Sequence, residues 1–343
     1  MRLISRTDIE QVQQGMIDFL TKAPIVTEAG RLLSWVNPAH PGYVYPEGMG
    51  LYLTLMAQLT GSEHPEVIDP THRVARALQE LVSPLGGIGI QGKLFSFDTC
   101  MAITGLLSYR RRLNGEVNAA TIARMGGFVV GMAERRLAVV NDTGSVPDVV
   151  PHWSTAFGAS MLKEVIALDA LATETGDERC RALAIEIADE VIAGCRSDGF
   201  FHVIPQDRSV YSHAHCYALE GLLHLRARGY RDATEMLREG ADRLCEWQNE
   251  DGSLFNWNNT PPTRERRKVG DACAQAVRIW LAVDRDAYRP QIERGVSFLA
   301  SLASPIGGLT YCLGSGDINS ITSIFAVQAI EWYLHEPRPD QIV

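Results

Sequence analysis

Apolar residues recur every three or four positions along most of the chain, and this spacing predicts amphipathic α-helices. The pattern is clear over residues 118–136, 178–196 and 232–249, and the same kind of segment occupies 7–21, 71–82 and 289–303. Strict alternation of apolar and polar residues, which is typical of half-buried strands, is nearly absent. The pattern therefore predicts an all-α protein.

Between these segments lie helices of a second kind, which are richer in small and apolar residues. Such helices are expected to be buried on most of their faces. Their predicted starts lie between 48 and 59 residues apart, near Glu47, Asp98, Ser154, His213, Asp271 and Asn319. A regular interval of this size indicates an array of supersecondary units.

The loops that lead into the second kind of helix also repeat. The sequence SPLGGI at 83–88 returns as SPIGGL at 304–309. Glycine ends the preceding helix because it adopts a left-handed conformation at little cost, and a polar residue is then expected to cap the next helix.

Twelve helices that alternate between an outer and an inner kind form six hairpins. A hairpin of this type cannot bury both faces of its inner helix alone, whereas six hairpins closed into a ring can. We therefore predict an (α/α)6 toroid, a single domain over residues 1–343 with parallel inner helices. An open helical solenoid is the alternative, but neither end of the array resembles a polar cap.

Composition narrows the range of functions. The chain of 343 residues has a net charge of −9, which argues against a surface that coats nucleic acid. We expect no membrane span and no signal peptide, because no apolar run is long enough and the first twenty residues mix charged and polar types. Seven cysteines without paired spacing are typical of reduced thiols. A cytoplasmic location is the resulting expectation.

The inner-helix amino termini of such a ring all point to one mouth, where free N–H groups favour anions. Long irregular stretches at 23–46, 139–152 and 255–270 fall on the same edge, and loops gathered in this way commonly carry function. The residues expected to contact a small-molecule substrate there are Tyr43, Tyr45, Glu47, Phe97, Trp153, Tyr211, Trp257, Arg264, Tyr311, Asp317 and Asn319.

Histidine is the strongest catalytic signal, because His152, His213 and His215 all lie at predicted inner-helix starts. An ordinary pKa of about 6.5 suits general acid or base chemistry. Residues two apart on a helix do not share a face, so one of the pair 213 and 215 is expected to line the cavity. Asp98 and Asp271 are the carboxylates that would act as acid or orient the histidine.

Plainer interpretations stay open for these residues. Asp98, Asp271 and Asp317 are all suited to capping a helix. The aromatic side chains are suited to packing, and Arg264 to a solvated loop. Asp271 and Cys273 with a neighbouring histidine are possible zinc ligands, but no ligand set has diagnostic spacing, and we expect no metal or other cofactor.

The segment 98–107, which comes after the lead-in Gly86-Gly87, and the segment 307–331, which begins with Gly307-Gly308, resemble repeats of the terpenoid cyclase and protein prenyltransferase superfamily. That resemblance implies the toroid. Of the three aspartates in the Asp-x-Asp-Asp-Thr motif of class II terpene cyclases only the last, Asp98, remains, and Phe97 occupies the proton-donating position. Asp271 and Cys273 match the Asp-x-Cys zinc pair of prenyltransferases, but the next unit offers Asp317 and no histidine. The toroid is also similar to that of sugar epimerases, six-hairpin glycosidases and some polysaccharide lyases.

Three functions follow as hypotheses. The first is an acid–base isomerase, cyclase or lyase of terpenoid-cyclase-like fold. An apolar cavity floor would favour this hypothesis, with a prenyl or polyketide-like substrate. The second is a carbohydrate-active enzyme, namely a sugar epimerase, glycoside hydrolase or lyase. The third is a non-catalytic helical scaffold that binds a partner on its rim, which predicts no perturbed titratable groups at the mouth. The oligomeric state is left open.

Overall fold

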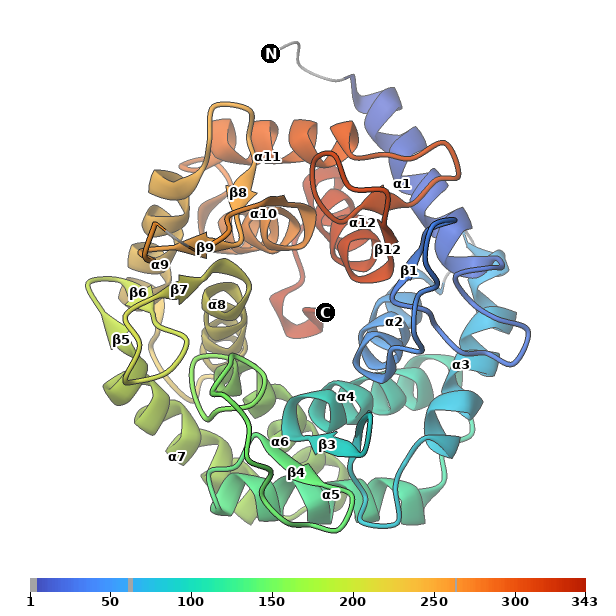
Figure 1. The fold of residues 1–343 in the computed structure, drawn as a ribbon, viewed down its shortest axis with the longest axis vertical. Helices are drawn as coiled ribbons and strands as arrows, with labels where there is room; N and C mark the ends of the chain where they lie inside the picture. Colours follow the sequence, from blue (N-terminus) through green and yellow to red (C-terminus); the bar gives the residue numbers. More distant parts are fainter. Residues whose placement is uncertain (1–4, 61–63, 263) are drawn as a thin grey trace.

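In the computed structural model, which describes residues 5–60, 64–262 and 264–343, the chain forms a closed ring of helical hairpins (Figure 1). The outer helices are α1 (Arg6–Thr21), α3 (Ile68–Glu80), α5 (Ala119–Glu134), α7 (Glu178–Cys195), α9 (Thr234–Trp247) and α11 (Arg289–Ser301). The inner helices are α2 (Pro46–Leu59), α4 (Ser96–Leu113), α6 (Met161–Thr175), α8 (Ser212–Ala227), α10 (Gly270–Asp284) and α12 (Ser320–Leu334). The predicted all-α toroid is confirmed.

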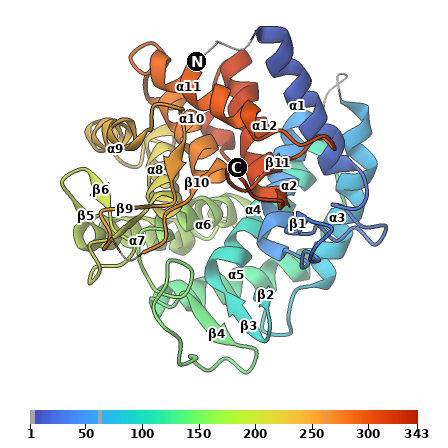
Figure 2. The ribbon, with the colours of Figure 1, turned by 45° about the horizontal axis from the view of Figure 1, so that its top comes forward.

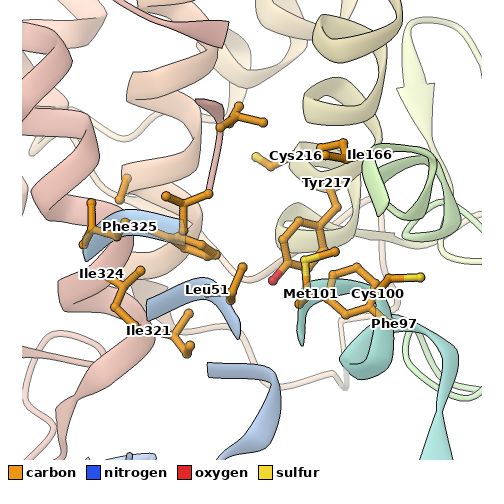
Figure 3. Close-up of a cluster of buried hydrophobic side chains, with 14 of the residues drawn as sticks. Leu51, Phe97, Cys100, Met101, Ile166, Cys216, Tyr217, Ile321, Ile324 and Phe325 are labelled. Carbon is orange, nitrogen blue, oxygen red and sulfur yellow. The ribbon is translucent and has the colours of Figure 1, made fainter. Parts of the chain in front are cut away.

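The two helix classes differ in burial as their sequences predict. Outer helix α3 buries one stripe that includes Val74 and Leu78, and its opposite face is solvated. Inner helix α12 is buried along nearly its whole length. The inner helices therefore form the wall of the ring, and their side chains fill its interior (Figure 3). None of the described helices is both long and apolar enough to cross a bilayer.

The ring closes where its last hairpin meets its first. Helix α12 packs against both α1 and α2, and the side-chain amide of Gln13 in α1 donates to Glu331 Oε2 in α12 at 2.9 Å. Backbone pairing joins the same two ends, because Trp35 and Val36 lie opposite Asn319 and Ile318. The open solenoid is therefore wrong.

The lead-in loops contain very short strands that the sequence pattern did not predict. Pairs form between neighbouring units, as between β7 and β9 and between β1 and β12, and so tie the loops into a collar on one face of the ring (Figure 2). The strands are β1 (Trp35–Val36), β2 (Ile88–Ile90), β3 (Lys93–Phe95), β4 (Val139–Asn141), β5 (Arg196–Ser197), β6 (Phe200–Phe201), β7 (Val210–Tyr211), β8 (Leu254–Phe255), β9 (Trp257–Asn258), β10 (Lys268–Val269), β11 (Leu309–Thr310) and β12 (Ile318–Asn319).

The third inner helix begins later than predicted, at Met161 instead of near Ser154. Gly158 in the intervening turns approaches the backbone of Val203 so closely that a Cβ would lie 2.0 Å from its carbonyl oxygen. Ser160 Oγ donates to the carbonyl of Trp153 at 2.9 Å. These contacts hold the segment before Met161 in turns, and residues 153 and 154 therefore belong to the mouth loops.

Glycines let neighbouring inner helices pack backbone to backbone. A Cβ on Gly50 of α2 would lie 2.4 Å from the carbonyl carbon of Met101 in α4. The contact is reciprocal, because a Cβ on Gly105 of α4 would lie 2.3 Å from the carbonyl oxygen of Gly50. The obstructing atoms are backbone atoms, so they cannot move aside as a flexible side chain can.

We predict that Gly50→Ala lowers the free energy of unfolding by about 1–3 kcal/mol, because the added methyl overpacks the contact between α2 and α4. The matched control is Gly127→Ala on the exposed face of α5, where a Cβ meets no atom within 4 Å. That control should gain about 0.5–1 kcal/mol from helix propensity. Urea unfolding of the three proteins measures both effects, and equal stability of the two variants would contradict the close contact.

Candidate active site

The first turns of five inner helices each place one titratable side chain at the face of the ring where the collar lies. These residues are buried, with Asp98, the most exposed of them, at 8%. They are Glu47 in α2, Asp98 in α4, Glu164 in α6, His213 in α8 and Asp271 in α10. The partial positive charge of a helix amino terminus favours a carboxylate there, whereas burial opposes its ionisation.

Glu47 is held by two phenols. The hydroxyl of Tyr45 donates to its Oε2 at 2.8 Å, and the hydroxyl of Tyr217 donates to its Oε1 at 3.3 Å. Burial nevertheless raises the pKa of Glu47 to about 7, against the lowering effect of these hydrogen bonds and of Lys163. Glu47 therefore changes its charge near neutral pH.

Asp98 is a carboxyl with a strongly raised pKa. Burial raises its pKa well above the ordinary value, and the nearby charges of Glu47 and Glu164 raise it further. These surroundings favour the protonated form of the Asp98 carboxyl.

Glu164, in the first turn of α6, is the carboxyl whose charge also raises the pKa of Asp98. Ser96 Oγ donates to its Oε2 at 2.6 Å, while its Oε1 is buried without a hydrogen-bond partner among the described residues. Burial raises the pKa of Glu164 to about 7. A protonated carboxyl is the form that such a pocket favours.

His213 and Asp271 lie on neighbouring helices with 3.8 Å between Nδ1 and Oδ2. The closer partner of Nδ1 is Oε1 of Gln275 at 2.6 Å. Burial lowers the pKa of His213 to about 3, so the imidazole is neutral at physiological pH. Burial raises the pKa of Asp271 to about 6, although the Ala272 N–H donates to its Oδ1 at 2.7 Å.

Aromatic rings lead from the rim to these groups. Arg264 lies over the ring of Trp257, which contacts Tyr211 at 4.7 Å, and Tyr211 stacks on Trp153 at 6.1 Å between centroids. The edges of Phe97 and His213 meet Trp153 at 5.9 and 5.6 Å. Flat apolar faces next to polar groups are suited to a ligand that has both kinds of surface.

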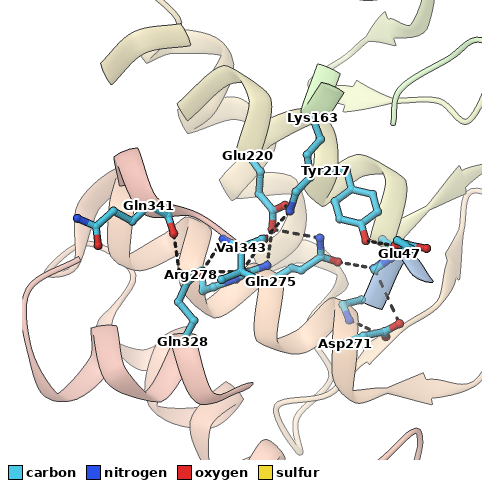
Figure 4. A network of polar contacts seen from close by, with 12 residues as sticks. Glu47, Lys163, Tyr217, Glu220, Asp271, Gln275, Arg278, Gln328, Gln341 and Val343 are labelled. Carbon is cyan, nitrogen blue, oxygen red and sulfur yellow. Dashed lines mark hydrogen bonds and ion pairs between the residues drawn. The ribbon is translucent and has the colours of Figure 1, made fainter. Parts of the chain in front are cut away.

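A buried ion cluster lies deeper in the ring (Figure 4). Glu220 accepts from Lys163 Nζ and from Arg278 Nη2, each at 2.5 Å, and all three side chains are at most 1% exposed. Lys163 and Arg278 also donate to the carbonyl oxygen of Val343 at 2.5 and 3.0 Å. The segment Pro339–Gln341 and the residues after it thus lie in the centre of the ring (Figure 1). The interior below the mouth is therefore polar as well as apolar.

The structure separates the three predicted catalytic histidines. His215 points away from His213 because the two are two residues apart on α8. Its Nδ1 accepts from the N–H of Phe201 at 3.1 Å and its Nε2 lies 3.3 Å from the carbonyl of Gly240, so it packs between α8 and the outer layer. His152 is exposed at the rim, 5.8 Å from the ring of Trp153.

The predicted substrate contacts are distributed over the mouth. Tyr43 is 42% exposed and lies 5.5 Å from Tyr45. Asp317 accepts from Asn37 Nδ2 at 2.7 Å on the rim, and Tyr311 is half-buried near Asp271.

The capping interpretation holds for none of the three aspartates, because Asp98 and Asp271 stand inside the first turn and Asp317 lies before α12. Asn319, a predicted substrate contact, caps α12 instead by accepting from the Thr322 N–H at 2.9 Å. Cys273 does not lie where it could share a zinc ion with His213, since its Sγ faces the carbonyls of Gly252 and Gly295 on the outer side of α10. The described residues contain no group of three potential metal ligands.

Sequence reasoning missed five buried polar residues that shape the site. They share a signal, which is a charged or amide side chain inside an inner helix that is otherwise apolar on every face. They are Lys163, Glu164, Glu220, Gln275 and Arg278.

No protein-family model matches the chain, and the search of curated proteins finds no match. Solved structures of similar fold include cellobiose 2-epimerase from Spirochaeta thermophila DSM 6192, at a TM-score of 0.72 and 12% identity over 96% of this chain and 97% of that chain. An unsaturated glucuronyl hydrolase specific for heparin aligns at 0.71 and 11% over 96% and 97%. An alpha-amylase from Clostridium perfringens aligns at 0.68 and 12% over 94% and 97%.

These similarities establish the (α/α)6 toroid fold. The toroid that the resemblance of the repeats implied is thus confirmed. The finer assignment to terpenoid cyclases or prenyltransferases is not shown, and the neighbours are described as enzymes of carbohydrate chemistry. At identities of 11–12% they fix the architecture, and the chemistry must be argued from this chain's own residues.

We predict that Glu164→Gln removes part of the pH dependence of stability. A folded pKa of about 7 against an ordinary 4.5 means that this group stabilises the fold below pH 4.5 and loses that contribution as the pH rises to 7. Glutamine imitates the protonated acid, so the variant should match the parent at pH 5 and exceed it at pH 8, by up to on the order of 3 kcal/mol.

Urea unfolding at pH 5 and pH 8 measures this difference. Glu235→Gln, at an exposed position in the first turn of α9, is the matched control and should follow the parent at both pH values. Parallel behaviour of Glu164→Gln and the parent would show that Glu164 is ionised in the folded protein.

Proposed function

We propose that the chain is an enzyme that cleaves a glycosidic bond by acid–base catalysis at the mouth of the ring. The observation that carries this proposal is the pairing of Asp98 with Glu47. Both are buried first-turn carboxyls on adjacent helices, and the charge of Glu47 raises the pKa of Asp98. Two carboxyls whose environments separate their pKa values are suited to act as an acid and a base.

Asp98 would act as the general acid. Its raised pKa keeps the proton available at neutral pH, and donation to the glycosidic oxygen turns the departing sugar into a neutral alcohol. Glu47, with a pKa of about 7, would be ionised during the reaction and serve as the base or nucleophile. Tyr45 and Tyr217 hold its two oxygens and so fix its orientation.

The aromatic wall supports a sugar substrate. Trp153 and Tyr211 are half-buried aromatic rings near the carboxyls, and Trp153 packs on the buried ring of Phe97. Sugar rings pack their C–H faces on such surfaces while their hydroxyls reach polar groups. The neighbouring structures described as a glucuronyl hydrolase, an amylase and a cellobiose epimerase are in keeping with a carbohydrate substrate.

Two observations weigh against the other hypotheses. An apolar interior would favour a prenyl-like substrate, but the interior below the mouth contains the buried ion cluster of Lys163, Glu220 and Arg278. A scaffold without catalysis predicts ordinary titratable groups at the mouth, whereas the pKa values of Glu47 and Asp98 are strongly raised.

Sugar epimerisation is the second candidate, because a neutral imidazole, His213, stands 3.8 Å from Asp271. Proton abstraction next to a sugar carbonyl requires a base, and His213 and Asp271 are candidates for it. The low pKa of His213, about 3, makes it a weak base and favours glycoside cleavage.

We expect Asp98→Asn and Glu47→Gln each to lower kcat/KM for glycoside cleavage by about 10²–10⁴-fold, because each removes one proton-transfer group. The measurement is release of reducing sugar from a panel of β-glycosides, α-glucans and unsaturated uronyl disaccharides, together with epimerisation of cellobiose. Asp286→Asn, 81% exposed in the turn after α10, is the matched control. Full activity in both site variants would refute the catalytic roles proposed for Asp98 and Glu47.

The pH profile of kcat/KM should be bell-shaped. Glu47 must be ionised, so the rate rises with pH through about 7. Asp98 must be protonated, so the rate falls again at a higher pH, where that carboxyl finally loses its proton. Initial rates from pH 5 to 10 test this expectation, and an optimum below pH 5 would contradict the assigned roles.

A further inference from the structure

Gln275 joins the buried ion cluster to the histidine of the site. Its Nε2 donates to Glu220 Oε1 at 3.1 Å, and its Oε1 lies 2.6 Å from His213 Nδ1 (Figure 4). Glu220 and Gln275 are both fully buried, so no water competes for these contacts. A single amide side chain therefore separates a charged cluster from an imidazole.

The orientation of this amide follows from the charge of its neighbour. Glu220 is paired with both Lys163 and Arg278, so its carboxylate oxygens accept hydrogen bonds and cannot donate them. Only the NH₂ group of Gln275 can face that carboxylate, and its carbonyl oxygen must then face His213. The reversed amide would place its carbonyl oxygen against the carboxylate of Glu220, so two acceptors would be in contact there without a proton between them.

The carbonyl of Gln275 in turn determines where the proton of His213 lies. A neutral imidazole has one N–H and one unprotonated nitrogen, and the nitrogen opposite a carbonyl acceptor must be the N–H. Asp271 Oδ2, at 3.8 Å, faces the same nitrogen and reinforces this choice. Within residues 5–60, 64–262 and 264–343, no hydrogen bond to Nε2 is present.

We propose that Gln275 is a positioning residue that locks His213 in the Nδ1–H tautomer and so keeps Nε2 as a hydrogen-bond acceptor for a substrate hydroxyl. The acceptor role rests on the proposed function, whereas the tautomer does not. The ring of Tyr217 contacts His213 at 4.2 Å between centroids. The charged groups beside the relay are Lys163 and Arg278 on the side of Glu220, and Asp271 on the side of His213. All of them favour the same arrangement.

The test is the ring-nitrogen spectrum of His213 in the full chain labelled with ¹⁵N-histidine. Long-range ¹H–¹⁵N correlations at pH 7.5 distinguish the two neutral tautomers and the imidazolium, and His213→Asn assigns the signals by their loss. The expected result is protonated Nδ1 and unprotonated Nε2. A protonated Nε2, or an imidazolium, in the unaltered protein would overturn the proposal whether or not any sugar is cleaved.

Gln275→Leu tests the lock itself, because it removes the carbonyl and leaves the ion pairs of Glu220 in place. We expect the His213 signals to shift toward a mixture of tautomers, and kcat/KM on a cleaved glycoside to fall about 10-fold. Gln13→Leu is the matched control, since Gln13 also donates to a glutamate, Glu331, but on the outer side of α12. An unchanged His213 spectrum in Gln275→Leu would assign the tautomer to another group and refute the lock.

Discussion

A buried ion cluster in the centre of the ring is the constraint on which the site depends. Glu220 is paired with Lys163 and Arg278 at 2.5 Å, and none of the three has appreciable contact with solvent. Taking such charges out of water costs several kcal/mol per ion, and removing one partner leaves the others uncompensated at a cost of about 3–5 kcal/mol. The cluster therefore fixes α6, α8 and α10 relative to one another, and these helices supply Glu164, His213 and Asp271 to the mouth.

Two opposing effects act on the carboxyls at the mouth, namely the helix amino terminus and burial. A helix amino terminus favours a negative charge by typically 0.3–1 kcal/mol, whereas full burial of a carboxylate opposes it far more strongly. Burial prevails at Glu47 and Asp98, whose pKa values rise. Because their surroundings differ in hydrogen-bond donors, the pKa values of the two carboxyls separate. Under the proposed function, the ring thus obtains a proton donor and a proton acceptor from one kind of functional group.

Periodicity and repeat spacing predicted the ring, the order of outer and inner helices and the face that carries the site. The start of α6 was wrong because nothing in the sequence marks the contact of Gly158 with Val203, a residue far along the chain. The mouth positions of Glu47, Asp98, His213 and Asp271 followed from their places at helix starts. The position of the ion cluster could not be predicted in this way, because a helix that is otherwise apolar on every face does not indicate which side faces the centre of the ring.

The neighbouring residues Phe97 and Asp98 give the first turn of α4 an apolar side chain and an acidic one. Successive residues on a helix differ by about 100° in direction, so the two side chains diverge from the same turn of α4. Phe97 packs on Trp153 and Tyr217, while Asp98 lies near Glu47 and Glu164. Under the proposed function, a ligand must lay a flat face against the aromatic wall and present a basic oxygen to Asp98. A sugar ring with its glycosidic oxygen meets both conditions, whereas a prenyl chain has no such oxygen at its reacting double bond.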